Sequence, residues 1–150
     1  MKEYDNGKTI FANGIFDLLH PGHIELLKFA KSLGGKLMVG LNSDRSTKIL
    51  KGPKRPIHNE YKRKMALENL SFVDEVVIFD DVRPTNIICD LMPDIMVKGK
   101  ESSIEEIRKI DKIPDTVEIV LYPIITDSSG NKISTTNLIK KAQINVVNDK

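Results

Sequence analysis

The sequence predicts an α/β sandwich, in which crossover helices pack on a five-stranded parallel sheet. Short apolar runs alternate along the chain with amphipathic stretches, as in parallel strands joined by crossover helices. The apolar runs are continuous rather than alternating, which is typical of strands buried on both faces. The chain has 150 residues, enough for one self-sufficient core and hardly enough for two. We therefore expect a single domain over residues 1–150.

The expected strands are short runs rich in Val, Ile, Leu or Met. They cover residues 9–13, 36–41, 75–79, 95–98 and 117–121. The first helix is expected over residues 21–33, because Pro21 suits a first turn and Gly34 suits a helix end. The remaining helices are expected over residues 59–70, from 85 to before Pro93, over 103–110 and from 134 onward, before a polar tail at 145–150.

Two connections, residues 42–58 and 123–133, are longer than packing requires. Long loops in compact domains often carry function. We therefore expect both segments to be loops that take part in the site.

The composition excludes several classes of protein. With 23 Lys and Arg against 21 Asp and Glu, the net charge is +2, so a protein built mainly to coat nucleic acid or an anionic membrane is not expected. The single cysteine, Cys89, cannot form an intramolecular disulfide, which favours a reducing, cytoplasmic location. The three histidines form no zinc-type cluster with it. The apolar run after the polar N-terminus is too short for a signal sequence or a membrane span, so neither is expected.

The most informative segment lies where the first strand turns into the first helix, and reads NGIFDLLHPGH over residues 13–23. If Gly22 opens the helix, free backbone N–H groups and the positive end of the helix dipole attract phosphate there. Gly22 also lets a phosphate approach the backbone closely. His20 and His23 flank the same spot as donors to anionic oxygens. The alternative is a surface turn with two incidental histidines.

This segment resembles the HxGH signature of the nucleotidyltransferase superfamily related to class I aminoacyl-tRNA synthetases, preceded by a G-x-F-D element at residues 14–17. Over roughly residues 9–141 the chain resembles the bacterial heptose 1-phosphate adenylyltransferase domain. Matching strings include NSD at 42–44, LKG at 50–52, VKG at 97–99 and STTN at 134–137. The resemblance implies a three-layer Rossmann-like sandwich of the HxGH nucleotidyltransferase fold. Glycerol-3-phosphate cytidylyltransferases are the nearest competitor.

The resemblance implies an enzyme that joins the NMP of an NTP to a phosphorylated sugar and releases pyrophosphate. The first choice is ATP with heptose 1-phosphate, which gives ADP-heptose, and the alternative is CTP with glycerol 3-phosphate. Mg²⁺ is expected to accompany the NTP, held by phosphate oxygens and water rather than by side chains. A separate sugar kinase is expected to supply the phosphosugar. Relatives often form homodimers, and no nucleic-acid or membrane partner is expected.

The same resemblance implies roles for individual residues. The expected catalytic residues are His20, His23 and Lys51. The expected contacts of the nucleotide and its phosphates are Asn13, Gly14, Phe16, Gly22, Lys48, Arg63, Ser134, Thr135 and Thr136. Asp17 and Lys98 are expected at the acceptor, although Asp17 could equally brace the turn, and Ser134 to Thr136 could be only an N-cap.

Residues 48–64 carry seven Lys or Arg against one acid, Glu60. This stretch could be a nucleic-acid patch, a solvated face or a mobile phosphate clamp. The resemblance favours the clamp for Lys48, Lys51 and Arg63. Tyr61 is the only aromatic residue in the stretch, which weakens a base-stacking role.

The sequence leaves the substrates and one alternative class open and argues against another class. Similar heptose enzymes continue Lys-Gly with Gly and Asp, whereas this chain reads KGKES over residues 98–102. This departure leaves open which phosphosugar is the acceptor and which nucleobase the NTP carries. A dinucleotide-dependent oxidoreductase needs a G-x-G-x-x-G motif. The chain lacks this motif, so that class of enzyme is not expected. A non-catalytic nucleotide sensor of the same fold stays open as the alternative of another class.

Overall fold

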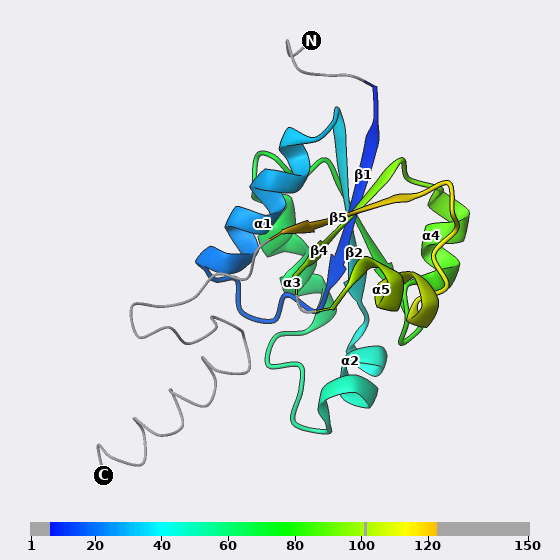
Figure 1. The fold of residues 1–150 in the computed structure, drawn as a ribbon. Helices are drawn as coiled ribbons and strands as arrows, with labels where there is room; N and C mark the ends of the chain where they lie inside the picture. The colour runs from blue at the N-terminus through cyan, green and yellow to red at the C-terminus, as the bar shows by residue number, and fades with distance from the viewer. Residues whose placement is uncertain (1–6, 101, 123–150) are drawn as a thin grey trace, which may run out of the picture.

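Five parallel strands form the centre of the protein in the computed structural model, which describes residues 7–100 and 102–122 (Figure 1). The strands are β1 (Thr9–Gly14), β2 (Lys36–Asn42), β3 (Glu75–Phe79), β4 (Ile95–Gly99) and β5 (Glu118–Tyr122). Their order in the sheet is β3-β2-β1-β4-β5, and every neighbouring pair is parallel. The predicted α/β class and the parallel sheet are confirmed, and each strand lies within one residue of its expected bounds.

Five helices accompany these strands in the described ranges. They are α1 (Pro21–Ser32), α2 (Asp44–Lys51), α3 (Glu60–Glu68), α4 (Thr85–Leu91) and α5 (Ile104–Ile110). Four of them were predicted at these places. None of the helices over residues 7–100 and 102–122 has the length and apolar character of a membrane span. The expected last helix from residue 134, the 123–133 loop and the 145–150 tail lie outside the described residues.

Helix α2 corrects one prediction, since residues 44–51 were expected to belong to a long loop. The Ser43 hydroxyl caps the helix by accepting a hydrogen bond from the Ser46 backbone N–H at 3.1 Å. Such a cap satisfies a backbone donor that would otherwise be unpaired in the first turn. Only residues 52–59 form a loop here, between α2 and α3.

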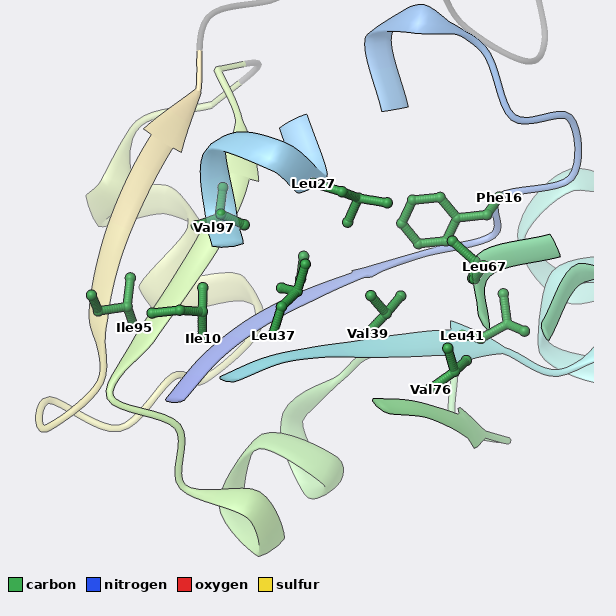
Figure 2. Packing of buried hydrophobic residues seen from close by; sticks show 12 residues of the cluster. Ile10, Phe16, Leu27, Leu37, Val39, Leu41, Leu67, Val76, Ile95 and Val97 are labelled. Atoms are coloured by element: carbon green, nitrogen blue, oxygen red, sulfur yellow. The ribbon is translucent and has the colours of Figure 1, made fainter. Parts of the chain in front are cut away.

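The sheet is covered on both faces, which makes three layers (Figure 1). Helices α1 and α3 cover one face, and residues such as Leu27 and Leu67 pack there on Ile10 and Val39 of the sheet (Figure 2). Helices α4 and α5 cover the other face, where the buried residues are Phe11, Met38, Phe79, Ile87, Ile88, Met96, Ile107, Ile113, Val117 and Ile119. Burial on both faces explains why the apolar runs of the strands are continuous.

The strand order also positions the site. The chain passes from β1 to β2 on one side, and later returns to pair β4 with the opposite edge of β1. In open parallel sheets, ligands bind outside the carboxyl ends of the strands at such a switch in direction. The residues that follow β1 and β4 therefore face one crevice.

Candidate active site

His20 is the N-cap of α1, and its imidazole closes the first turn of the helix. Its Nδ1 accepts hydrogen bonds from the backbone N–H groups of Gly22 at 3.0 Å and His23 at 3.3 Å. An accepting Nδ1 carries no proton, so in the neutral ring the proton is on Nε2. The cap therefore fixes the tautomer and leaves Nε2–H as a donor.

This arrangement corrects the expectation of free N–H groups at Gly22. Pro21, at the first helical position, has no N–H to offer. The N–H groups of Gly22 and His23 donate to His20, and that of Ile24 donates to the His20 carbonyl at 3.2 Å. The N-terminus of α1 thus presents an imidazole N–H rather than bare backbone donors.

The His20 and His23 rings are stacked, with their centroids 3.7 Å apart. The Phe16 ring meets His23 edge-on at 5.2 Å, so it fixes the orientation of that imidazole. His20 Nε2 and His23 Nδ1 are buried, and neither has a hydrogen-bond partner among the described residues. Buried polar atoms are normally paired. Two unpaired imidazole nitrogens on neighbouring rings suit the oxygens of a bound anion.

Both imidazoles favour the neutral form. Burial lowers the pKa of His20. Burial, and secondarily the neighbouring charge of His20, lowers the pKa of His23 to about 4, against the weaker opposing effect of a hydrogen bond with the Leu18 backbone. An anion bound at the unpartnered nitrogens of the two rings would reverse this preference, since opposite charge stabilises imidazolium.

A pocket of about 130 Å³ lies beside His23, between the ends of β1 and β4. Five residues predicted for the site line it together: Asn13, Gly14, Phe16, His23 and Lys98. Asn13 contributes a buried Oδ1 that has no partner within the described residues. A Cβ at Gly14 would lie 3.0 Å from the Phe16 ring, so a side chain there would crowd the residue that contacts His23. The structure thus brings the strand-end residues predicted from the sequence into one place.

Asp17 is buried against the loop that follows α2. Its carboxylate accepts hydrogen bonds from Arg55 Nε at 2.9 Å and from the backbone N–H groups of Ile57 at 2.8 Å and His58 at 2.9 Å. Burial alone would raise the pKa of Asp17, but these backbone donors and the Arg55 guanidinium together lower it. Through these contacts Asp17 braces the turn after β1 against the loop that follows α2. This was one of the two alternatives from the sequence, the other being a role at the acceptor.

Arg63 is fully buried on α3 and joins four segments. Its guanidinium donates to the carbonyls of His58, Ile15 and Asn42 and to the Asp44 carboxylate, at 2.8–2.9 Å. These bonds use four of its five N–H groups. The structure therefore shows Arg63 tying the β1–α1 turn to β2 and α2, and its predicted contact with phosphate stays a prediction.

The other predicted residues stand apart from this pocket. Lys48 and Lys51 lie on α2 with exposed side chains, beyond the carboxyl edge of the sheet (Figure 1). Ser134, Thr135 and Thr136 lie outside the described residues. Gly22 is in the first turn of α1, where its N–H is already engaged by His20.

Sequence reasoning missed two groups of residues around the site. Arg55 was assigned to the basic stretch, yet its partner Asp17 lies 38 positions earlier in the chain. Asp111 and Arg83 were not singled out, although both line a pocket that adjoins Lys98. No motif marks these residues, because the contacts that bring them to the site are between distant segments.

The chain is similar in sequence to known proteins over most of its length. The family model described as Cytidylyltransferase-like matches residues 11–141. Among curated proteins, "Bifunctional protein HldE" of Paramagnetospirillum magneticum is 44% identical over 135 residues, which are 89% of this chain and 27% of that protein. The protein of the same name from Helicobacter pylori is 52% identical over 101 residues, 67% of this chain and 22% of that protein. The chain thus spans about a quarter of the length of these relatives.

Solved structures share the fold. A lipopolysaccharide core biosynthesis protein from Thermoplasma volcanium is 31% identical, with a TM-score of 0.65 over 76% of this chain and 94% of that one. A pantothenate synthetase from Thermus thermophilus is 16% identical, with a TM-score of 0.63 over 87% of this chain and 61% of that one. The second likeness shows the fold alone.

Proposed function

This chain belongs to the cytidylyltransferase-like family, and we propose that it is a nucleotidyltransferase that joins the NMP of an NTP to a phosphorylated sugar. An oxygen of the acceptor phosphate attacks the α-phosphorus of the NTP. The bond from that phosphorus to the oxygen bridging to the β-phosphate breaks, and pyrophosphate leaves with the electron pair. The acceptor phosphate is already ionised, so catalysis consists mostly of positioning and electrostatic stabilisation.

The observation that carries this proposal is the pair of stacked histidines with buried, unpartnered nitrogens in the described part of the chain. His20 Nε2–H is fixed as a donor by the cap, and His23 can donate from Nδ1 once an anion has raised its pKa. Donors held in place before the reaction stabilise charge that builds on the transferred phosphoryl oxygens. Lys98, at the end of β4, adds a positive charge to the pocket that His23 lines.

We assign the remaining predicted residues to the outer parts of the site. Lys48 and Lys51 are proposed to reach the triphosphate from α2, as point charges on flexible side chains. Ser134, Thr135 and Thr136 are proposed at the β- and γ-phosphates. Asp17 and Arg63 support this proposal as braces of the turn that carries His20.

Mg²⁺ is proposed to enter with the NTP, as part of the substrate, bound by phosphate oxygens and water. Over residues 7–100 and 102–122, no group of three or more His, Cys, Asp or Glu side chains is arranged to hold a metal ion. The donors around His20 and His23 are nitrogen atoms suited to anionic oxygens. These donors suit the phosphate oxygens with which Mg²⁺ is proposed to arrive.

The proposed substrates are ATP and heptose 1-phosphate, with ADP-heptose as product. Support comes from relatives called HldE, from the lipopolysaccharide core biosynthesis protein of similar fold, and from the resemblance to heptose 1-phosphate adenylyltransferases. A separate kinase is proposed to supply the phosphosugar, and a homodimer is the proposed assembly. A cytoplasmic location is proposed from the single cysteine.

The test is a matrix of ATP, CTP, GTP and UTP against heptose 1-phosphate, other sugar 1-phosphates and glycerol 3-phosphate, followed by pyrophosphate release. ATP with heptose 1-phosphate is expected to give the highest kcat/KM. Activity with CTP and glycerol 3-phosphate alone would make the protein a cytidylyltransferase. Binding of NTP without pyrophosphate release from any pair would make it a nucleotide sensor.

A further inference from the structure

A second pocket, of about 350 Å³, lies next to the His23 pocket at the carboxyl end of β4. The two pockets share Leu26, Lys98 and Gly99. Two residues line only the second pocket and carry charge: Arg83, which precedes α4, and Asp111, which follows α5. A substrate that has its phosphate beside His23 and Lys98 can therefore extend into this second pocket.

Asp111 is the buried acid of this pocket, with a residue exposure of only 5%. Burying a carboxylate is costly unless other charges compensate for it. Lys98 Nζ lies 3.7 Å from Asp111 Oδ2, and Arg83 Nη1 lies 3.4 Å from Asp111 Oδ1. Strong charge-assisted hydrogen bonds measure about 2.7–2.9 Å. Asp111 is thus compensated by two cations without tight bonds to them, and its oxygens can still accept hydrogen bonds.

Hydrogen bonds from both neighbouring helices hold the main chain of Asp111. The Asp111 N–H donates to the Ile107 carbonyl at 2.9 Å, and the Asp111 carbonyl accepts a 2.6 Å hydrogen bond from the Thr85 hydroxyl. The main chain of Asp111 therefore has a fixed position relative to both α4 and α5, and its buried carboxylate projects from this fixed point. The Arg83 side chain is 60% exposed and lies at the open side of the pocket.

The lining gives this pocket a chemical preference. Apolar walls from Ile107 and Ile110 stand beside Ser102 and the three charged groups. Carboxylate oxygens accept hydrogen bonds from hydroxyl groups, while the two cations and Ser102 can donate to hydroxyl oxygens. Asp111 already compensates much of the positive charge of Lys98 and Arg83, so a second anionic group on the substrate would gain less from these cations and would be repelled by the Asp111 carboxylate. The pocket therefore suits a neutral body rich in hydroxyl groups.

We propose that Asp111 is a specificity-determining residue of the acceptor site: it accepts hydrogen bonds from the hydroxyl groups of a sugar phosphate and disfavours acceptors with a second anionic group remote from the reacting phosphate. This inference rests on the proposed function, because it takes the occupant of the second pocket to be the acceptor. It concerns the choice of acceptor and leaves the transfer step unchanged.

The test compares Asp111→Asn with the wild type and with a matched control, Asp115→Asn. Asp115 is a carboxylate on the exposed surface, 3.9 Å from Arg108. Calorimetry without NTP measures Kd for heptose 1-phosphate and for glucose 1,6-bisphosphate. In Asp111→Asn, Kd for heptose 1-phosphate is expected to rise at least about tenfold, while Kd for the bisphosphate falls at least about threefold because Arg83 and Lys98 lose their counter-charge. Asp115→Asn is expected to change neither value by more than about twofold.

Equal changes for both ligands, no change for either, or no binding of heptose 1-phosphate to the wild type would overturn the inference. If Asp111→Asn does not fold, Arg83→Gln replaces it, since Arg83 is mostly exposed. Arg83→Gln removes one cation, so the bisphosphate is expected to bind at least about threefold more weakly. An unchanged Kd for the bisphosphate in Arg83→Gln would also overturn the inference.

Activity separates this inference from the proposed function. The wild type could be active while Asp111→Asn keeps the wild-type ratio of Kd for heptose 1-phosphate to Kd for the bisphosphate. That outcome would support the proposed function and reject the role of Asp111. Alternatively, Asp111 could change the choice between the two ligands in a protein that releases no pyrophosphate from any NTP. That outcome would support the role of Asp111 in ligand choice and reject the transfer activity. KM for heptose 1-phosphate is expected to rise in Asp111→Asn with kcat within about threefold, as for a residue that binds the acceptor away from the reacting atoms.

Discussion

The imidazole rings of His20 and His23 lie stacked, with 3.7 Å between their centroids and 21° between their planes. Two positive charges at this distance repel each other, so the free site favours neutral rings. A polyphosphate is the kind of ligand that can compensate charge on both rings. The stacked pair therefore connects the pH response of the free protein to the binding of its substrate.

Acidification is expected to destabilise the fold through His23. Its pKa is about 4 in the folded chain, against 6.5 for an unperturbed histidine. Because the folded pKa is the lower one, the contribution of His23 to stability is complete above pH 6.5 and is lost as the pH falls from 6.5 through about 4. The free energy of unfolding, measured by urea denaturation from about pH 7.5 to 4.5, should fall more steeply for the wild type than for His23→Asn.

Parallel pH profiles for the wild type and His23→Asn would contradict this assignment.

Asp17 acts in a different range of pH. Its pKa is below 3.8 in the folded chain, so its contribution is present above 3.8 and is lost as the pH falls below that value. The titration from about pH 7.5 to 4.5 therefore reports the effect of His23 without that of Asp17.

The two nitrogens of His20 can be tested separately by two substitutions. In His20→Asn the side-chain oxygen can still cap α1, but the donor at Nε2 is gone. We expect kcat to fall at least about a hundredfold, as is typical for the loss of one preorganised donor, while stability stays within about 0.5 kcal/mol. In His20→Ala the cap is lost too, which should cost about a further 1 kcal/mol. Pyrophosphate release and urea denaturation measure these effects.

His23→Ala is expected to lower kcat by at least about a hundredfold as well, because it removes the second donor of the pair. Circular dichroism should show an intact fold in this variant. Near-normal turnover in His20→Asn and His23→Ala, with folded protein in both, would rule out the assigned site.

The strands and the strand-end residues could be predicted because local sequence determines them. Each strand is a continuous apolar run, and Asn13, Gly14 and Lys98 lie at the ends of such runs. A parallel sheet brings these ends to one edge whatever the details of the loops. The sequence pattern was therefore enough for the α/β fold and for the gathering of these strand-end residues around one pocket.

Other features depend on geometry that a local pattern does not contain. Helix α2 was missed because half of its eight residues are charged and a Gly-Pro pair follows it, both typical of a loop. The His20 cap was missed because histidine is not a common N-cap. The Asp17–Arg55 brace and the buried Arg63 join segments 38 and 48 residues apart, and only the tertiary structure shows such contacts.

Asp17→Asn is expected to loosen the loop between α2 and α3. An amide keeps one acceptor oxygen, but its NH₂ group would face the donors of Arg55, Ile57 and His58. Breaking a buried and hydrogen-bonded charge pair typically costs about 3–5 kcal/mol, so we expect a loss of at least about 2 kcal/mol in the free energy of unfolding. Hydrogen exchange should speed up at the amides of Ile57 and His58, which donate to Asp17.

Glu75→Gln is the control for Asp17→Asn, because the Lys36–Glu75 pair is exposed on both sides. Exposed pairs contribute about 0–1 kcal/mol. If both variants lose the same small amount, or if exchange at residues 57 and 58 is unchanged, Asp17 does not brace this loop.

Lys51→Ala is expected to weaken catalysis more than NTP binding. A flexible ammonium group contributes most when charge has built up at the α-phosphorus, so kcat should fall at least about tenfold while Kd for the NTP rises less than about threefold. Lys54→Ala is the matched control, since Lys54 is also exposed and follows α2 by three residues. Equal losses in the two variants, or a loss only in Kd, would reject the clamp role of Lys51.

Limited proteolysis tests whether this basic region closes over the nucleotide. Residues 44–51 form α2, so cleavage is expected between residues 52 and 58, where the loop is accessible. Adding NTP and Mg²⁺ should slow cleavage at least about threefold, because lysines bound to the triphosphate would hold the loop in fewer cleavable conformations. Lys51→Ala should lose much of this protection, and Lys54→Ala should keep it. If cleavage is indifferent to NTP and the protein instead shows tight, salt-sensitive binding to RNA or DNA, the basic stretch is a nucleic-acid patch.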